Sequence, residues 1–148
     1  MFEKQTVKLN PYVKILSDEW IEHDNIIIGV DFDDTIKPWR EDITDHDEVI
    51  SLLKKAQASN GIIIIYTGSP ESRYDEIREY CKRIGIRISK INENVIVPFG
   101  DNRKIYCNIY LDDRSGLKEA MHILDSALYL YRAHKIRKSL DNAGEQAE

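Results

Sequence analysis

Three short runs of β-branched residues constrain the fold of this chain more than any other feature of its sequence. Residues 26–30 and 62–66 are apolar throughout and do not alternate with polar residues, which is typical of strands buried on both faces of a parallel sheet. Residues 105–111 alternate in part, which indicates a strand nearer an edge. Residues 86–88 and 95–97 are weaker strand candidates. The sequence therefore predicts a parallel sheet.

Helical patterns lie between and after these runs. Apolar residues recur at helical spacing over about 44–59, 69–84 and 116–137, with Thr44 and Ser69 as expected start signals. Strands that alternate with helices form right-handed βαβ units. We therefore expect an α/β fold whose sheet is covered by helices on both faces.

Composition limits the class of protein. The chain has 148 residues, which suits one domain, and its 21 Lys and Arg against 26 Asp and Glu give a net charge of −5. That charge argues against a surface that binds nucleic acid or anionic membranes as a whole. Two cysteines are too few for a disulfide scaffold or a thiolate zinc site.

Two sequence signals bear on where the protein resides. The first five residues show no signal-peptide pattern, and no apolar run is long enough to span a membrane. We therefore expect a single cytoplasmic domain over residues 1–148. Within it, residues 1–20 form an N-terminal extension that carries a short helix around Trp20, and residues 141–148 form a frayed polar tail.

Polar side chains follow each of the three main predicted strands. The carboxyl ends of parallel strands meet at one edge of a sheet, where ligands bind. We therefore expect three clusters to converge at that edge: Asp31-Phe32-Asp33-Asp34-Thr35, Thr67-Gly68-Ser69-Pro70 and Asp112-Asp113-Arg114.

The aspartates of these clusters predict a metal site. Asp31 and Asp33 lie two residues apart at a strand end, where an extended chain points them the same way. Close approach to Asp112 and Asp113 would crowd like charges unless a cation is bound. Oxygen ligands with access to solvent suit Mg²⁺. The alternative is that these aspartates are only turn and cap residues; two acidic clusters at separate strand ends favour the metal.

The second cluster offers neutral donors for a phosphate group. The hydroxyl of Thr67, the amide of Gly68 and the helix start at Ser69 together suit a phosphate-binding loop, and the same segment also fits a helix cap. Lys104, just before the third strand, would supply a balancing cation. Lys90 is the alternative lysine, and a surface position is the alternative interpretation of Lys104.

The order of these motifs resembles the haloacid dehalogenase (HAD) superfamily of phosphohydrolases. The resemblance covers roughly residues 26–130 and rests on a DxDxT motif at 31–35, a strand that ends in Thr67, then Lys104 and the acidic pair at 112–113. It implies a HAD-like, Rossmann-like three-layer α/β sandwich with a mostly parallel central sheet, and a Mg²⁺-dependent phosphatase. Asp34 stands where the family often has glycine.

The resemblance also assigns roles. Asp31 would attack phosphorus to form an aspartyl-phosphate, and Asp33 would protonate the leaving oxygen and later activate water. Mg²⁺ would be held by Asp31, the main-chain carbonyl of Asp33, and an acid of the last motif, Asp113 with Asp112 close behind. Family members that cleave carbon–halogen bonds lack an acid at the place of Asp33, so a phosphatase is favoured. The residues that would bind phosphate are Thr67, Gly68 and Lys104.

The substrate stays open at this point. Residues 36–43 leave room for a flap but not for a folded cap domain, and capless relatives act on large substrates or cover the site with a second copy in a homo-oligomer. Trp39 and Arg40 in the flap could stack on a base or bind a second phosphate, or Trp39 could simply pack the flap onto the domain. A small phosphate ester such as a nucleotide or sugar phosphate fits, as does a nucleic-acid 3′-phosphate; no membrane partner is expected.

Two other classes of function use similar parts. A receiver-like regulatory domain also carries acids, Mg²⁺ and an aspartyl-phosphate, but its acidic pair precedes a lone acceptor aspartate, which is not the order here. A non-catalytic domain that binds a phosphorylated ligand would keep the fold and lose the chemistry, whereas every motif residue is present in this chain.

Overall fold

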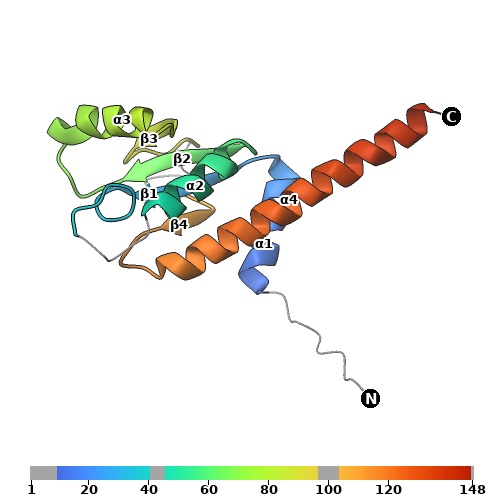
Figure 1. The fold of residues 1–148 in the computed structure, drawn as a ribbon, viewed down its shortest axis with the longest axis horizontal. Coiled ribbons are helices and arrows are strands. Elements are labelled where there is room, and N and C mark those ends of the chain that lie inside the picture. Colours follow the sequence, from blue (N-terminus) through green and yellow to red (C-terminus); the bar gives the residue numbers. More distant parts are fainter. Residues whose placement is uncertain (1–9, 41–45, 97–103, 148) are drawn as a thin grey trace, which may run out of the picture.

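The computed structural model describes residues 10–40, 46–96 and 104–147. Its strands form one four-stranded sheet in the order β3-β2-β1-β4, and all three pairings are parallel. This confirms an α/β fold with a parallel sheet flanked by helices (Figure 1). In chain order the elements are α1 (Pro11–His23), β1 (Ile26–Asp31), α2 (His46–Gln57), β2 (Gly61–Tyr66), the 3₁₀ turn η1 (Glu71–Arg73), α3 (Tyr74–Arg83), β3 (Ile88–Ile91), β4 (Ile109–Leu111) and α4 (Leu117–Gln146).

The strand order decides which face the helices cover. The chain steps from β1 to β2 to β3 in one direction, so right-handed crossovers place α2 and α3 on the same face. On that face, Ile26, Ile28 and Val30 pack in one buried cluster with residues of α2, α3 and α4. On the other face, Ile27 and Ile64 pack with non-helical residues: Cys107, Val95, Ile105 and Tyr110. Within the described segments, the predicted helical cover is thus found on one face only.

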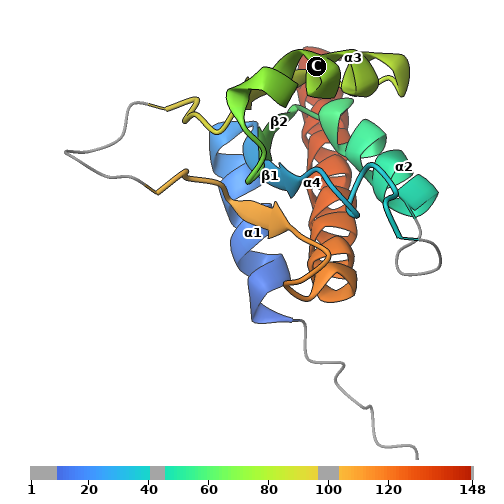
Figure 2. The ribbon, with the colours of Figure 1, turned by 90° about the vertical axis from the view of Figure 1, so that its left-hand side faces the viewer.

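The N-terminal helix α1 packs along α4 (Figure 2). It begins at Pro11, where the side chain of Asn10 accepts a hydrogen bond from the main-chain N–H of Tyr12 at 2.9 Å. The fully buried Trp20 stacks on Tyr131 of α4, with ring centroids 5.1 Å apart. Residues 11–20 are therefore part of the folded domain, whereas the sequence had placed only a short helix around Trp20 within an N-terminal extension.

Several boundaries differ from the sequence predictions. The second predicted helix starts as a 3₁₀ turn before α3, and the third predicted strand is reduced to β4. Helix α4 continues to Gln146 instead of ending near Arg137, so the tail is helical over most of its length (Figure 1). The predicted cap Thr44 and Val97 of a weak strand candidate lie outside the described residues.

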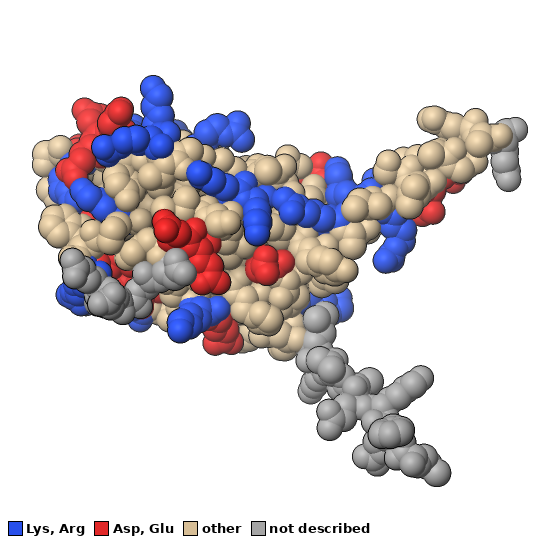
Figure 3. Space-filling view, in the orientation of Figure 1, with Lys and Arg blue, Asp and Glu red and all other residues tan. Residues whose placement is uncertain are grey.

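The composition of the helices and the charge of the surface were compared with the sequence predictions. No helix within the described segments is both long enough and apolar enough to cross a membrane. Figure 3 shows basic and acidic side chains together on the face that carries α2 and α4. That face is therefore mixed in charge, as expected for a chain with a small net negative charge.

Candidate active site

The carboxyl ends of β1 and β4 bring three aspartates together. Asp31 is the last residue of β1, and Asp112 and Asp113 directly follow β4. The two strands are parallel neighbours, with Val30 opposite Leu111. One carboxylate oxygen of each aspartate lies within 4.8 Å of the others. The first and third predicted clusters therefore meet.

This meeting point is where the strand order reverses. From β1 the chain proceeds outward through β2 to β3 and then returns to place β4 on the other side of β1. Open α/β sheets bind ligands at such a reversal, because the connections diverge there and leave a crevice beyond the strand ends. The aspartate cluster thus lies at the position in this topology that is best suited to a ligand.

The hydroxyl of Thr35 lies within hydrogen-bond distance of two of the three aspartates. It lies 3.1 Å from Oδ2 of Asp31 and 3.2 Å from Oδ1 of Asp113, and it accepts the main-chain N–H of Asp113 at 3.0 Å. Thr35 is fully buried. One side chain therefore ties the end of β1 to the end of β4. The sequence analysis gives Thr35 no role of its own, and the DxDxT motif is the signal from which this role could be predicted.

Burial and the neighbouring carboxylates both act on the pKa of Asp31. Burial raises the pKa of Asp31 to about 7, and the neighbouring Asp113 and Asp112 act in the same direction, while the Thr35 hydrogen bond lowers it. A divalent cation would relieve this crowding. Every donor in the cluster is a carboxylate oxygen, the ligand type that Mg²⁺ prefers, so the residues fit that metal.

Asp112 has partners of its own. Its Oδ2 accepts a hydrogen bond from the Tyr66 hydroxyl at 3.2 Å, and its Oδ1 accepts the main-chain N–H of Arg114 at 2.9 Å. Burial raises the pKa of Tyr66, with the charge of Asp112 next in effect, so its hydroxyl stays a donor. Asp112 is thus held by a tyrosine of β2 and Asp113 by Thr35.

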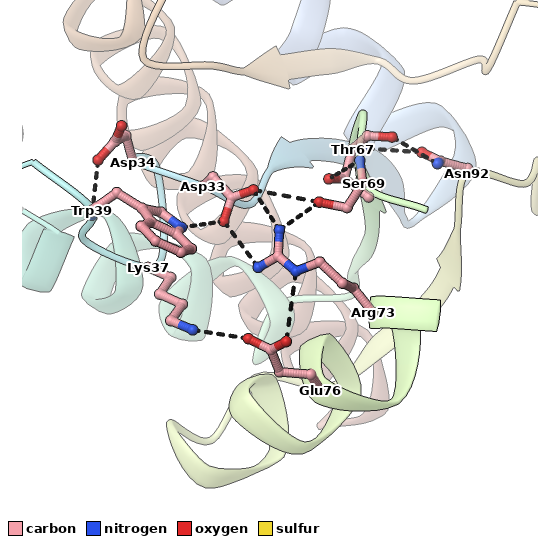
Figure 4. A network of polar contacts seen from close by, with 9 residues as sticks. All are labelled: Asp33, Asp34, Lys37, Trp39, Thr67, Ser69, Arg73, Glu76 and Asn92. Carbon is pink, nitrogen blue, oxygen red and sulfur yellow. Dashed lines mark hydrogen bonds and ion pairs between the residues drawn. The ribbon is translucent and has the colours of Figure 1, made fainter. Parts of the chain in front are cut away.

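Asp33 points towards Arg73 and Ser69, near the start of α3 (Figure 4). It forms an ion pair with Arg73, whose Nη1 lies 3.1 Å from Oδ2, and it accepts a hydrogen bond from Nε1 of Trp39. Ser69, which follows β2, lies 3.5 Å from the same Oδ2. The side chain of Asp33 therefore stands beside the predicted phosphate loop, while its main chain stays next to Asp31.

The neighbouring Asp34 shapes the flap. Its φ of +62° is in the left-handed region that favours glycine, which is the residue the HAD resemblance often has here. Oδ1 of Asp34 accepts the main-chain N–H groups of Trp39 at 2.9 Å and Arg40 at 2.8 Å. These bonds, that of Arg40 first, lower the pKa of Asp34. Asp34 thus holds residues 37–40 close to Asp33; residues 41–43 of the predicted flap lie outside the described residues.

The loop after β2 is clamped by Asn92. Its Oδ1 accepts the N–H of Thr67 and its Nδ2 donates to the carbonyl of Thr67, both at 2.8 Å. The hydroxyl of Thr67 accepts the N–H of Ser69 at 3.1 Å, and no heavy atom lies within 4 Å of where a Cβ on Gly68 would stand. The loop is therefore fixed on one side and open on the other. Asn92 escaped the sequence analysis because nothing local marks its contact with Thr67.

The two candidate lysines lie in different places. Nζ of Lys104 is 6.0 Å from the ring centroid of Tyr110, whose ring meets that of Tyr66, the partner of Asp112. Lys90 is on the edge strand β3, separated from β1 by β2, and its Nζ is 3.8 Å from Glu93. Lys90 lies opposite Ile64, which is on the same face of the sheet as Ile27 and Asp31, so these positions do not decide between the two lysines.

Comparisons with known proteins do not identify a family for this chain. No protein-family model, no curated protein and no solved structure matches the chain. The resemblance to the HAD superfamily thus rests on the motifs and their spacing, and the site must be interpreted from its own chemistry.

Proposed function

We propose that this protein is a Mg²⁺-dependent phosphatase of the HAD type, which hydrolyses a phosphomonoester through an aspartyl-phosphate on Asp31. The observation that carries the proposal is the cluster of Asp31, Asp112 and Asp113 at the reversal point of the sheet, tied by Thr35. Repulsion between these carboxylates raises the free energy of the site unless a cation is bound. The same cation can also balance the negative charge of a phosphate ester.

The residues divide the chemistry between them. Asp31 would form a bond to phosphorus while the bond from phosphorus to the leaving oxygen breaks, and Asp33 would give that oxygen a proton. Asp33 would then take a proton from the water that releases phosphate from Asp31. Thr67, Gly68 and Lys104 would hold the phosphate oxygens. This division agrees with the position of Asp33 beside Ser69 and apart from the acidic cluster.

The metal would be held by Asp31, the main-chain carbonyl of Asp33, and Asp113 or Asp112. When bound, Mg²⁺ would neutralise the carboxylates and orient the phosphate for in-line attack. The flap supports a substrate with a planar or second anionic group, because Trp39 is 62% exposed and Nζ of Lys37 lies 5.5 Å from the centroid of its ring. A nucleotide, a sugar phosphate and a nucleic-acid 3′-phosphate all meet this description.

The test is hydrolysis of p-nitrophenyl phosphate with Mg²⁺, with chelator, and by Asp31→Asn. We expect turnover that needs the metal and is lost in the Asp31 variant. The matched control is Asp125→Asn, an exposed aspartate on α4, which should behave as wild type. Metal-independent turnover, or an Asp31 variant with near wild-type activity, would reject the mechanism.

If the wild-type protein does not hydrolyse p-nitrophenyl phosphate, the next test is binding of beryllofluoride in the presence of Mg²⁺. Binding that Asp31→Asn abolishes would indicate a site that accepts phosphoryl groups but needs another substrate. Absence of binding would favour a domain without catalysis.

A further inference from the structure

Both carboxylate oxygens of Asp33 are engaged by side chains from outside the acidic cluster (Figure 4). Nη1 of Arg73 lies 3.1 Å from Oδ2 and Nη2 lies 3.4 Å from Oδ1, so the guanidinium meets the carboxylate as a fork. Nε1 of Trp39 donates to Oδ1 as well. A two-point contact of this kind fixes the plane of a carboxylate, which a single hydrogen bond does not.

Arg73 is itself held in place. Its Nη1 donates to Oγ of Ser69 at 2.6 Å, and its Nε lies 3.5 Å from Oε2 of Glu76. Glu76 also pairs with Lys37 at 2.9 Å, and the guanidinium lies 5.8 Å from the ring centroid of Trp39. Arg73 therefore has little freedom to serve as a ligand for substrate, and its contacts favour a role in orienting Asp33.

The location of the fork ties it to the leaving group. Ser69 belongs to the loop after β2 that would hold the phosphate, and it contacts both Asp33 and Arg73. When Asp33 gives its proton to the leaving oxygen, it acquires a negative charge next to the guanidinium. A preorganised positive charge at that place stabilises the transition state without rearrangement of solvent.

We propose that Arg73 is the positioning residue for Asp33, whose carboxylate it holds beside the loop after β2. This inference rests on the phosphatase function proposed above. In the step concerned, the bond from Asp31 to phosphorus forms, the bond from phosphorus to the alcohol oxygen breaks, and that oxygen takes the proton of Asp33. A weakly acidic alcohol needs this proton to leave, whereas the leaving group of an acyl phosphate does not.

The test compares aryl phosphates of similar shape whose phenols range from strongly acidic, with a nitro group, to weakly acidic, with an alkyl group. We expect Arg73→Gln to lower kcat/KM for the weakly acidic phenols by about 10- to 100-fold and for the nitrophenol by much less. Asp33→Asn should show the same dependence more strongly, and the double variant should be no slower than Asp33→Asn.

Matched variants separate positioning from folding. Arg78→Gln, also on α3 and paired with Asp75 at the surface, should leave all esters unaffected. Arg73→Lys keeps the charge without the fork and should restore part of the loss. Should Arg73→Gln fail to fold by thermal unfolding, Trp39→Phe, which removes one donor to Asp33, should show a weaker form of the same dependence.

The outcomes are distinct. An equal loss of kcat/KM for all esters in Arg73→Gln would overturn the positioning role but not the phosphatase function. The same holds if the double variant loses as much as the product of the two single losses. A folded wild-type protein with no metal-dependent turnover of any ester and no beryllofluoride binding would instead reject the proposed function, and the inference would fall with it.

Discussion

Replacing Thr35 by valine tests whether one buried hydroxyl organises the acidic cluster. The hydroxyl carries one proton, so it donates to Asp31 or Asp113 but not to both at once, and it also accepts the N–H of Asp113. A hydrogen bond to a charged group contributes about 1.5–3 kcal/mol, and an amide left without a partner costs about 1–3 kcal/mol. Since Asp113 is only partly buried, we expect Thr35→Val to lower the free energy of unfolding by about 3 kcal/mol.

The assay is urea unfolding at pH 7 in the presence of chelator, followed by circular dichroism. With a slope of about 2 kcal/mol per molar urea, the loss corresponds to a midpoint that is lower by about 1.5 M. Thr35→Ser is the matched control, because it keeps the hydroxyl and loses one methyl group, at a cost of about 1 kcal/mol. The two variants should therefore be clearly separated.

Two results would refute this reasoning. A valine variant within about 0.5 kcal/mol of wild type would mean that the register of β1 and β4 alone holds the aspartates together. A serine variant as unstable as the valine variant would mean that packing of the methyl group, and not the hydroxyl, is what the site requires.

Three further predictions concern protonation and packing. Because the pKa of Asp31 rises from 3.8 to about 7 on folding, the metal-free folded state binds a proton more tightly than the unfolded state. The free energy of unfolding in chelator should therefore decrease as the pH rises from 4 to 7. Urea unfolding of Asp31→Asn should not show this decrease. Burial raises the pKa of Cys81 and of Cys107 to about 11, so Ellman's reagent should react slowly with the native protein and rapidly with two thiols in urea; fast native reaction would contradict their burial. Trp20→Phe keeps the ring stack and loses the 2.9 Å hydrogen bond to the carbonyl of Ser59, and unfolding should show a loss of about 1–2 kcal/mol.

The parts of the fold that could be predicted from sequence follow local rules. Unbroken β-branched runs predicted β1 and β2, because strands buried on both faces need no polar side. The rule that ligand groups follow the carboxyl ends of strands predicts that Asp31, Asp112 and Asp113 lie at one edge of the sheet. Asn10 and Pro11 are also a local helix-start signal, and α1 could have been predicted from them.

Other features depend on contacts between distant residues. Arg73 reaches Asp33 across forty positions of sequence, and no spacing rule distinguishes it from the other basic residues of the chain. The continuation of α4 to Gln146 is not predicted by hydrophobic periodicity, because the last residues are polar and have no apolar stripe, although Ala, Glu and Gln among them are good helix formers.

The return of the chain from β3 to β4 explains both the wrong prediction of helices on two faces and the location of the site. Helices on both faces require the chain to step outward from the first strand in two directions, each by a helical crossover. In the part of the chain that the structure describes, both helical crossovers lead one way, to β2 and β3, and the return to β4 ends in non-helical residues that pack on Ile27 and Ile64. That return also makes β1 and β4 neighbours and so places Asp113 against Asp31. Within the described residues, one face of the sheet lacks helices because the return to β4 is not helical there, whereas the acidic cluster depends on the pairing of β4 with β1. A change that moved β4 away from β1 would therefore separate Asp112 and Asp113 from Asp31.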